Sequence, residues 1–385
     1  MKFEKPLAVI GAAALMFMAT DAVTYAATGS SLVLGRLNQA NATTTMQNTG
    51  TTPALKLVTK STATAPMIVN GKGKVTNLYA DRAATADNAS KVGGKTVTQV
   101  VASVRPAGVI WVAKSGGQFT SLSAALASIT NNGPAQRYVI KVAPGTYIET
   151  ASVALKSYVD VEGSGQHVTT ITCACGSNVD PTSDGLSAVL RVTGPGSVVS
   201  VRGVTVNNTG SNLTYSAGIW TGSTAPGDVS LVDVTSTAIG GTSISIGVSN
   251  TRSSPTMTNV TATATGATTN LGVFDHTSSP TMTNVTATAT GGSRNFGIWN
   301  QLSSSPTMTS VKASGTGGTT GYGVQLGVDG SVLIRDSFLE GSTFSVVSGG
   351  KVRILNTVFN GNTSGIGAAA CIGALTTQLN NYTCL

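Results

Sequence analysis

The chain has few charged and few aromatic side chains, at 10% and 5% of its 385 residues, and it has only two histidines and four cysteines. A zinc site needs about four thiolate or imidazole ligands, and Cys173 and Cys175 have no histidine near them in the sequence. The sequence contains neither a Gly-x-Ser-x-Gly elbow nor a phosphate-binding loop. The missing elbow argues against a serine nucleophile. We expect no bound metal and no other cofactor, and no feature of the sequence predicts a nucleic-acid partner.

Long hydrophobic runs are also scarce. One apolar run, residues 6–18, follows Lys2 and Lys5 and precedes small residues up to Ala26. This order is typical of a secretory signal peptide, and the run is shorter than the ~20 residues that a membrane-spanning helix needs. The alternative is an uncleaved anchor. We predict a signal peptide over residues 1–26 and a secreted or cell-surface mature chain without a membrane span.

What the sequence does contain is a repeat. Residues 246–323 hold nearly the same unit three times, and the prolines Pro255, Pro280 and Pro306 are 25 and 26 residues apart. Such a period is typical of a solenoid. Each unit has short runs of alternating apolar and Thr/Ser residues, divided by Gly, Asn and Ser-Pro, which indicates strands and turns. The repeats predict a β-solenoid of roughly nine coils, each about 4.8 Å above the last.

Aligned coils predict three columns of equivalent residues. The first faces inward and is aliphatic: Val201, Leu231, Met257, Met282, Met308, Ile334 and Ile354. The second also faces inward: Ile219, Val248, Val273, Ile298 and Val324. The third is polar: Asp233, Asn259, Asn284, Ser310, Asp336 and Asn356. Asn and Asp tolerate left-handed backbone and bond to nearby main chain, so the third column predicts a ladder of turns.

The region before the repeats carries a family resemblance. Residues 111–172 include WVAKSGGQFTSLSAAL, YVIKVAPGTYIE and VDVEGSGQHVTTIT. This order resembles the first coils of pectin methylesterases and related pectin-lyase-like proteins, and it implies an all-β, right-handed parallel β-helix. The spacing of Leu122, Ala125, Leu126 and Ile129 predicts a short helix that caps its first coil.

The expected domains follow from these patterns. After the signal peptide, residues 27–104 form a basic, β-rich stalk or oligomerisation region, with nine Lys/Arg against two Asp up to residue 110. This region resembles the stalks of some secreted bacterial and phage tail-fibre-like proteins, which implies a homotrimer. Residues 105–110 are expected to be a linker, 111–137 the first strand and cap helix, 138–365 the β-helix, and 366–385 a C-terminal tail. Within that tail region Cys371 and Cys384 can form a disulfide, whereas two-residue spacing on a strand disfavours a bond between Cys173 and Cys175.

Catalytic residues are harder to assign. The paired Asp and Gln motifs of pectin methylesterases and the Trp-Ile-Asp-His run of pectate lyases are missing, although Phe274-Asp275-His276 shares two letters and is better interpreted as a turn variant. Asp233 and Asp336 share a column four coils apart, on the order of 19 Å, too far for paired-carboxylate chemistry. The carboxylate candidates are Asp160, Glu162, Asp233, Asp275 and Asp336.

Aromatic residues suggest a binding surface instead. If the second column faces inward, the next residues face outward, so Trp220, Phe274 and Trp299 form an exposed strip interrupted by Ser249. A sugar ring can lie on an aromatic face while its hydroxyls find polar partners. The polar residues expected beside the strip are Asp275, His276, Asn300, Gln301, Arg252 and Arg294. The alternative is that the rings pack onto the turns.

These observations favour a secreted, non-catalytic β-helix protein that binds polysaccharide or a cell-surface glycan, as a surface or adhesion element. A pectinesterase-like or lyase-like enzyme acting on acidic polysaccharide is the alternative, and a purely structural fibre is the third possibility.

Overall fold

The computed structural model describes residues 106–362 except 184, 211 and 223–227, together with 369–372, 374–376 and scattered positions between 43 and 60. The signal peptide, nearly all of region 27–104 and the expected Cys371–Cys384 bond lie outside the described residues. The chain divides after Thr85, and every described strand follows that point. No helix in the described part is long and apolar enough to cross a membrane.

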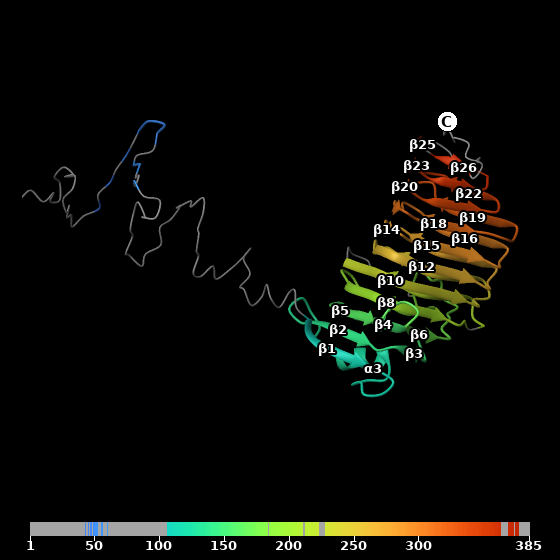
Figure 1. Cartoon of the computed structure of the whole chain (residues 1–385), viewed down its shortest axis with the longest axis horizontal. Coiled ribbons are helices and arrows are strands. Elements are labelled where there is room, and N and C mark those ends of the chain that lie inside the picture. Colours follow the sequence, from blue (N-terminus) through green and yellow to red (C-terminus); the bar gives the residue numbers. More distant parts are fainter. Residues whose placement is uncertain are drawn as a thin grey trace, which may run out of the picture. The chain divides into compact units, whose positions relative to one another are not determined.

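Two parallel sheets wind into a right-handed β-helix of about nine turns (Figure 1). The 18-stranded sheet consists of β1 (Pro106–Val112), β2 (Arg137–Val142), β3 (Gly145–Ile148), β5 (Val159–Gly163), β6 (Thr169–Cys173), β8 (Val198–Asn208), β10 (Asp228–Ile239), β12 (Thr256–Thr265), β14 (Thr281–Thr283), β15 (Thr286–Thr290), β17 (Thr307–Thr309), β18 (Lys312–Gly315), β20 (Ser331–Arg335), β21 (Phe338–Gly341), β23 (Lys351–Leu355), β24 (Val358–Asn360), β25 (Ala369–Ile372) and β26 (Leu375–Thr376). The 8-stranded sheet consists of β4 (Val153–Leu155), β7 (Ala188–Val192), β9 (Tyr215–Gly222), β11 (Ile244–Thr251), β13 (Thr269–His276), β16 (Arg294–Gln301), β19 (Thr320–Leu326) and β22 (Phe344–Ser348).

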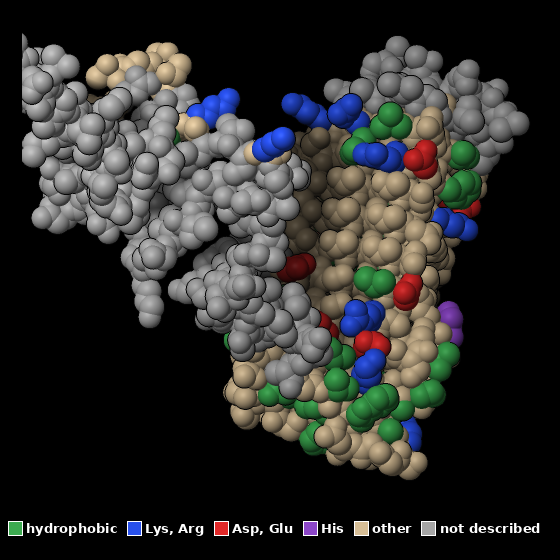
Figure 2. Space-filling view, turned by 60° about the vertical axis from the view of Figure 1, so that its left-hand side comes forward, with side chains coloured by type: hydrophobic (Ala, Val, Ile, Leu, Met, Phe, Trp, Pro, Cys, Tyr) green, Lys and Arg blue, Asp and Glu red, His purple; other side chains and the backbone are tan. Residues whose placement is uncertain are grey.

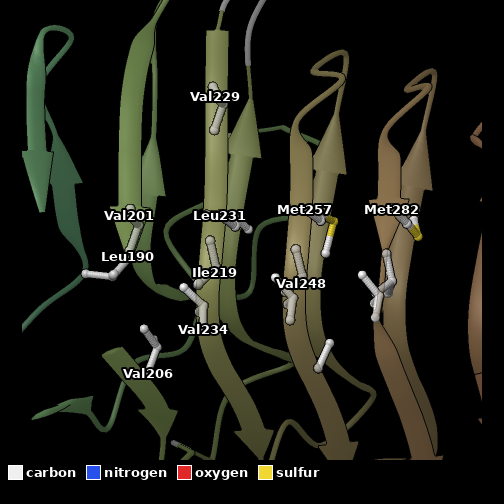
Figure 3. Close-up of a cluster of buried hydrophobic side chains, with 14 of the residues drawn as sticks. Leu190, Val201, Val206, Ile219, Val229, Leu231, Val234, Val248, Met257 and Met282 are labelled. Atoms are coloured by element: carbon white, nitrogen blue, oxygen red, sulfur yellow. The ribbon is translucent and has the colours of Figure 1, made fainter. Parts of the chain in front are cut away.

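The coils stack in register, which confirms the predicted aliphatic columns. Met257 pairs with Met282, and Met282 with Met308, in the 18-stranded sheet. Val248 pairs with Val273, and Val273 pairs with Ile298, in the other sheet. Every member of both columns is fully buried. Figure 3 shows part of both columns inside successive coils, with Val201, Leu231, Met257, Met282, Ile219 and Val248 labelled. Each coil therefore completes the core of its neighbours.

The polar column is a ladder of left-handed turns, as predicted. All of its members have positive φ, between 45° and 54°. The amide of Asn259 donates to the Asp233 carboxylate at 2.9 Å, and the amide of Asn284 donates to Asn259 Oδ1 at 2.8 Å. The ladder bends the 18-stranded sheet between β14 and β15 and between β17 and β18, where Asn284 and Ser310 separate the strands.

The predicted cap helix is α3 (Leu122–Ser128). Ser121 caps it by accepting a hydrogen bond from the Ala124 amide, and the Leu122 amide donates to the Glu149 carboxylate at 2.7 Å. Leu122 and Leu126 are buried over the first coil. The apolar face of α3 thus closes the core at that end.

The prediction of a linker over residues 105–110 is wrong from residue 106 onward, because strand β1 begins at Pro106 and pairs with β2. Pro106 is the first residue of that strand. Proline lacks an amide hydrogen, and the first position of a strand tolerates that loss.

A valine in the turn ladder should destabilise the protein. Asn284→Val places a β-branched residue at φ 53°, which should cost about 1–3 kcal/mol of unfolding free energy. The control Asn284→Gly loses the same side-chain bond without the backbone strain and should cost less. Thermal unfolding midpoints of both variants check this prediction, and equal midpoints would contradict the role of the left-handed turn.

Candidate functional site

The carboxylates of β5 lie in a network of ion pairs. Asp160 and Glu162 alternate with the buried Val159 and Val161 and so face outward, as predicted. Glu162 accepts a hydrogen bond from Lys141 Nζ at 2.6 Å and contacts the Arg202 guanidinium at 3.2 Å. In Figure 2 acidic and basic side chains lie side by side on this lower end of the β-helix.

Asp160 is partnered in the same way, by the Ser200 amide at 2.9 Å and the Arg137 guanidinium at 3.5 Å. The Lys141 hydrogen bond, helped by Arg202, holds the pKa of Glu162 below its usual value in spite of partial burial. A general acid needs a raised pKa near the working pH. The Glu162 carboxylate is therefore suited to an ion pair rather than to proton donation.

Open cavities lie beside three members of the turn ladder, Asp233, Asp336 and Asn356. One, of about 690 Å³, is lined by glycines and by the charged or polar Glu162, Ser164, Gln166, Arg202 and Asp233. Another, of about 420 Å³, includes Asp336. Asp233 and Asp336 line different cavities, and four in-register steps separate their coils. The sequence-based conclusion that they cannot act as a pair stands.

Asp275 lies inside the helix rather than on its surface. It belongs to β13, where Phe274 faces out and Asp275 faces in, with no exposed surface. Burial raises its pKa to about 7, although a 2.8 Å hydrogen bond from the Asn250 amide opposes the shift. Asn300 is equally buried. The interpretation of this stretch as a turn and the placement of Asp275 and Asn300 beside a surface strip are both wrong.

The aromatic column has the predicted register but not the predicted exposure. Ser249 pairs with both Trp220 and Phe274, and Phe274 pairs with Trp299. Trp220 and Phe274 are only 5% exposed, so the sequence-based expectation of an exposed strip is wrong for both. Trp299 is half-buried.

The segment between β6 and β7 explains the burial of Trp220. The Trp220 indole donates a hydrogen bond to the Pro181 carbonyl at 2.5 Å. Gly185 lies so close that a Cβ there would be 2.3 Å from the indole ring. This segment folds back over the first member of the column, and nothing in the periodicity of the repeats predicts that.

A smaller aromatic surface remains on β16, β19 and β22, which we call the aromatic platform: Trp299, Tyr322 and Phe344, all half-buried. Trp299 stacks on the buried Phe296, with ring centroids 4.9 Å apart. Tyr322 meets Phe296 edge-on at 5.3 Å and Phe344 at 5.8 Å. The platform therefore rests on a rigid aromatic base.

Polar groups surround the platform. The exposed Arg294 guanidinium lies 5.3 Å from the Phe296 ring and 5.8 Å from the Trp299 ring. Gln301 and Gln325 are half-buried on the same strands. His276 is also half-buried, and its pKa is lowered by burial and by the positive charge of Arg252. Of the predicted binding residues, Trp299, Arg294 and Gln301 lie on β16 at the platform.

Tyr322 and Phe344 lie outside the strip that the sequence predicts, whereas Gln325 continues its register by pairing with Trp299. The sequence-based prediction assumes strict alternation along each strand, so it assigns only the residue that follows each second-column residue to the outer face. The pairing skips Gly297, so that Phe296 before it and Trp299 after it lie on the outer side, while Ile298 between them faces the core. A Cβ on Gly297 would lie 2.6 Å from the backbone of neighbouring strands. The glycine that precedes each second-column residue was the available signal.

Cys173 and Cys175 form a disulfide, which corrects the expectation that their spacing disfavours one. Strand β6 ends at Cys173, so the pair is not extended. The Cα atoms are 5.2 Å apart, within the range that a disulfide can bridge and below the ~6.6 Å of two strand residues.

Fold and surface together define a parallel β-helix protein with an aromatic platform on its smaller sheet. No protein-family model and no curated protein sequence matches the chain. Solved structures that resemble it include pectin methylesterase from Aspergillus niger, with 14% identity, TM-score 0.39 and coverage of 72% of this chain and 88% of that one. Pectate lyase Pel9A has 16% identity and a TM-score of 0.45, and the match covers 72% of this chain and 75% of that one. Pectin methylesterase PemA from Erwinia chrysanthemi has 13% identity and a TM-score of 0.37, and the match covers 70% of this chain and 91% of that one. The likeness concerns the fold alone.

Adding a single methyl group at Gly185 should expose Trp220. Gly185→Ala meets the indole ring and must also adopt φ 66°, so the covering segment should move away from β9. We expect the emission of Trp220 to shift to longer wavelength and to become quenchable by acrylamide, measured in a background with Trp111 and Trp299 replaced by Phe. An unchanged spectrum in the folded variant would contradict this packing.

Proposed function

We propose that the protein is a non-catalytic, extracellular, polysaccharide-binding β-helix protein and that the aromatic platform is its binding surface. The half-buried Trp299 carries this proposal, because its ring is fixed by stacking on Phe296 and is bordered by the exposed Arg294. A fixed ring loses little conformational freedom when it binds a ligand.

The chemistry of the platform suits a sugar chain. The apolar face of a pyranose can lie on Trp299 or Tyr322, since aromatic rings supply a large apolar contact area. Hydroxyl groups can bond to the amides of Gln301 and Gln325. A guanidinium such as that of Arg294 binds carboxylates well, because it offers several donors in one plane. An acidic polysaccharide therefore fits better than a neutral one.

The placement of the candidate carboxylates supports a binding role over the enzyme alternative. Asp160 and Glu162 are occupied by ion pairs, and Asp275 is inside the core. Asp233 and Asp336 lie on coils separated by four in-register steps. Acid–base chemistry on a glycosidic bond uses two carboxyl groups ~5–10 Å apart, and these side chains offer no such free pair.

Export and assembly also belong to the proposal. The signal-like residues 1–26 would direct the chain out of the cell. The basic region 27–104 would join three copies of the chain, so that one assembly carries three aromatic platforms. Linked sites raise apparent affinity for a repetitive polymer. A purely structural fibre would keep the trimer and lack glycan binding.

Removal of the Trp299 ring should weaken binding. We expect Trp299→Ala to reduce the affinity for polygalacturonate, pectin or alginate, whichever binds best, at least tenfold, which is about 1.4 kcal/mol. Isothermal titration or affinity electrophoresis measures the change. Trp111→Ala is the matched control, because Trp111 is 50% exposed on β1 and lies outside the platform. Equal affinities for Trp299→Ala and the native protein would contradict the assignment.

A further inference from the structure

A row of polar side chains runs through the interior of the β-helix. Thr221, Asn250, Asp275 and Asn300 occupy equivalent positions on β9, β11, β13 and β16, and each is at most 1% exposed. On the next strand the position belongs to Leu326. Burying such groups is costly unless they are hydrogen-bonded.

Bonds join the first part of this row. The Thr221 hydroxyl donates to Asn250 Oδ1 at 2.8 Å, and Asn250 Nδ2 donates to Asp275 Oδ1 at 2.8 Å. The chain of bonds then stops. Asp275 Oδ2 and Asn300 Oδ1 are both buried and have no hydrogen-bond partner within the described structure.

These two unpaired atoms belong to residues that pair across adjacent coils. With Asp275 ionised, both atoms are acceptors and cannot bond to each other. A protonated carboxyl group has one O–H donor. One proton on Oδ2 would therefore give partners to both atoms, while Oδ1 continues to accept from Asn250.

We propose that Asp275 is a neutral carboxylic acid in the native protein and that its O–H donates a hydrogen bond to Asn300 Oδ1. This bond joins β13 and β16 beneath the aromatic platform and depends on pH, and we call it the latch. Loss of the proton leaves an unpaired charge between β13 and β16 and loosens both strands. Asn300 and Trp299 are neighbours on β16, so the loosening reaches the platform. This last step rests on the proposed function, whereas the latch itself does not.

The surroundings of Asp275 are uncharged. Asp275 pairs with Asn250 on one side and Asn300 on the other, and the Met257 sulfur lies 3.9 Å from the amide nitrogen of Asn250. The titratable neighbour His276 alternates to the outer side of β13, where Arg252 and Asp180 act on it. Burial alone raises the pKa of Asp275, to about 7.

The direction of the pH effect follows from this shift. The ordinary pKa of Asp is 3.8, so between about pH 4 and pH 7 the native protein keeps a proton that the unfolded chain has released. The contribution of Asp275 to stability is therefore greatest below pH 4, falls as the pH rises towards 7, and changes no further above it. A carboxylate held by an ion pair would have the opposite dependence.

The test compares thermal unfolding of the native protein and of Asp275→Asn from pH 5 to pH 8. The asparagine is always neutral and can donate to Asn300, so it should hold the latch closed at every pH. We expect the native midpoint to fall relative to that of Asp275→Asn by about 5–10 °C over this range. Because His276 is present in both proteins, its titration cancels in the comparison.

Asp336→Asn is the control, since Asp336 is an exposed carboxylate that accepts a bond from Asn356 at 3.3 Å. It removes the same charge and should keep the pH dependence of the native protein. Parallel curves for the native protein and Asp275→Asn would overturn the proposal.

If Asp275→Asn does not fold, amide hydrogen exchange of the native protein tests the latch instead. After correction for intrinsic exchange rates, peptides from β13 and β16 should lose protection between pH 5 and pH 8, whereas β2 and β5 should not. Equal protection at both pH values would overturn the latch. Measuring polygalacturonate binding at pH 5 and pH 8 separates the proposed binding function from the proposed latch. Absence of binding at both pH values contradicts the binding function, whereas the unfolding data test the latch independently of binding.

Discussion

The in-register, parallel hydrogen bonding of each coil to the next is the constraint on which the whole structure depends. Because paired strands repeat about every 4.8 Å, equivalent residues of successive coils must stack directly on one another. Met257, Met282 and Met308 consequently form one continuous aliphatic row. The same register places Asn259 and Asn284 where their amides can bond from turn to turn.

Stacking has a different consequence for polar residues, because a side chain placed inside one coil is confined between its neighbours above and below. Asp275 lies between Asn250 and Asn300 in the buried polar row, and it accepts a hydrogen bond from Asn250. The outer face of the same strands carries Phe274 and Trp299. On β13 and β16, a buried polar side chain of the interior therefore directly follows an aromatic side chain of the outer face.

Most of the fold follows from the sequence, since period, alternation and turn residues are local signals. The two aliphatic columns, the turn ladder and the cap helix are predictable for that reason. The site was predictable only in part. Alternation fails at glycines such as Gly297, where the pairing skips a residue, and Trp220 is covered by a segment that precedes β7. The Cys173–Cys175 bond depends on where β6 ends, which the pattern does not fix to one residue.

We propose a β-helix whose smaller sheet binds polysaccharide through the aromatic platform, and the candidate carboxylates offer no free pair for catalysis. On this proposal the protein binds a polysaccharide and leaves it chemically unchanged. The most direct measurement is incubation of the purified protein with methylated and unmethylated pectin and with alginate, followed by co-sedimentation and mass spectrometry of the soluble products. We expect the protein to be retained on a polysaccharide whose chains stay intact. Release of methanol, unsaturated oligosaccharides or shortened chains that depends on folded protein would contradict it.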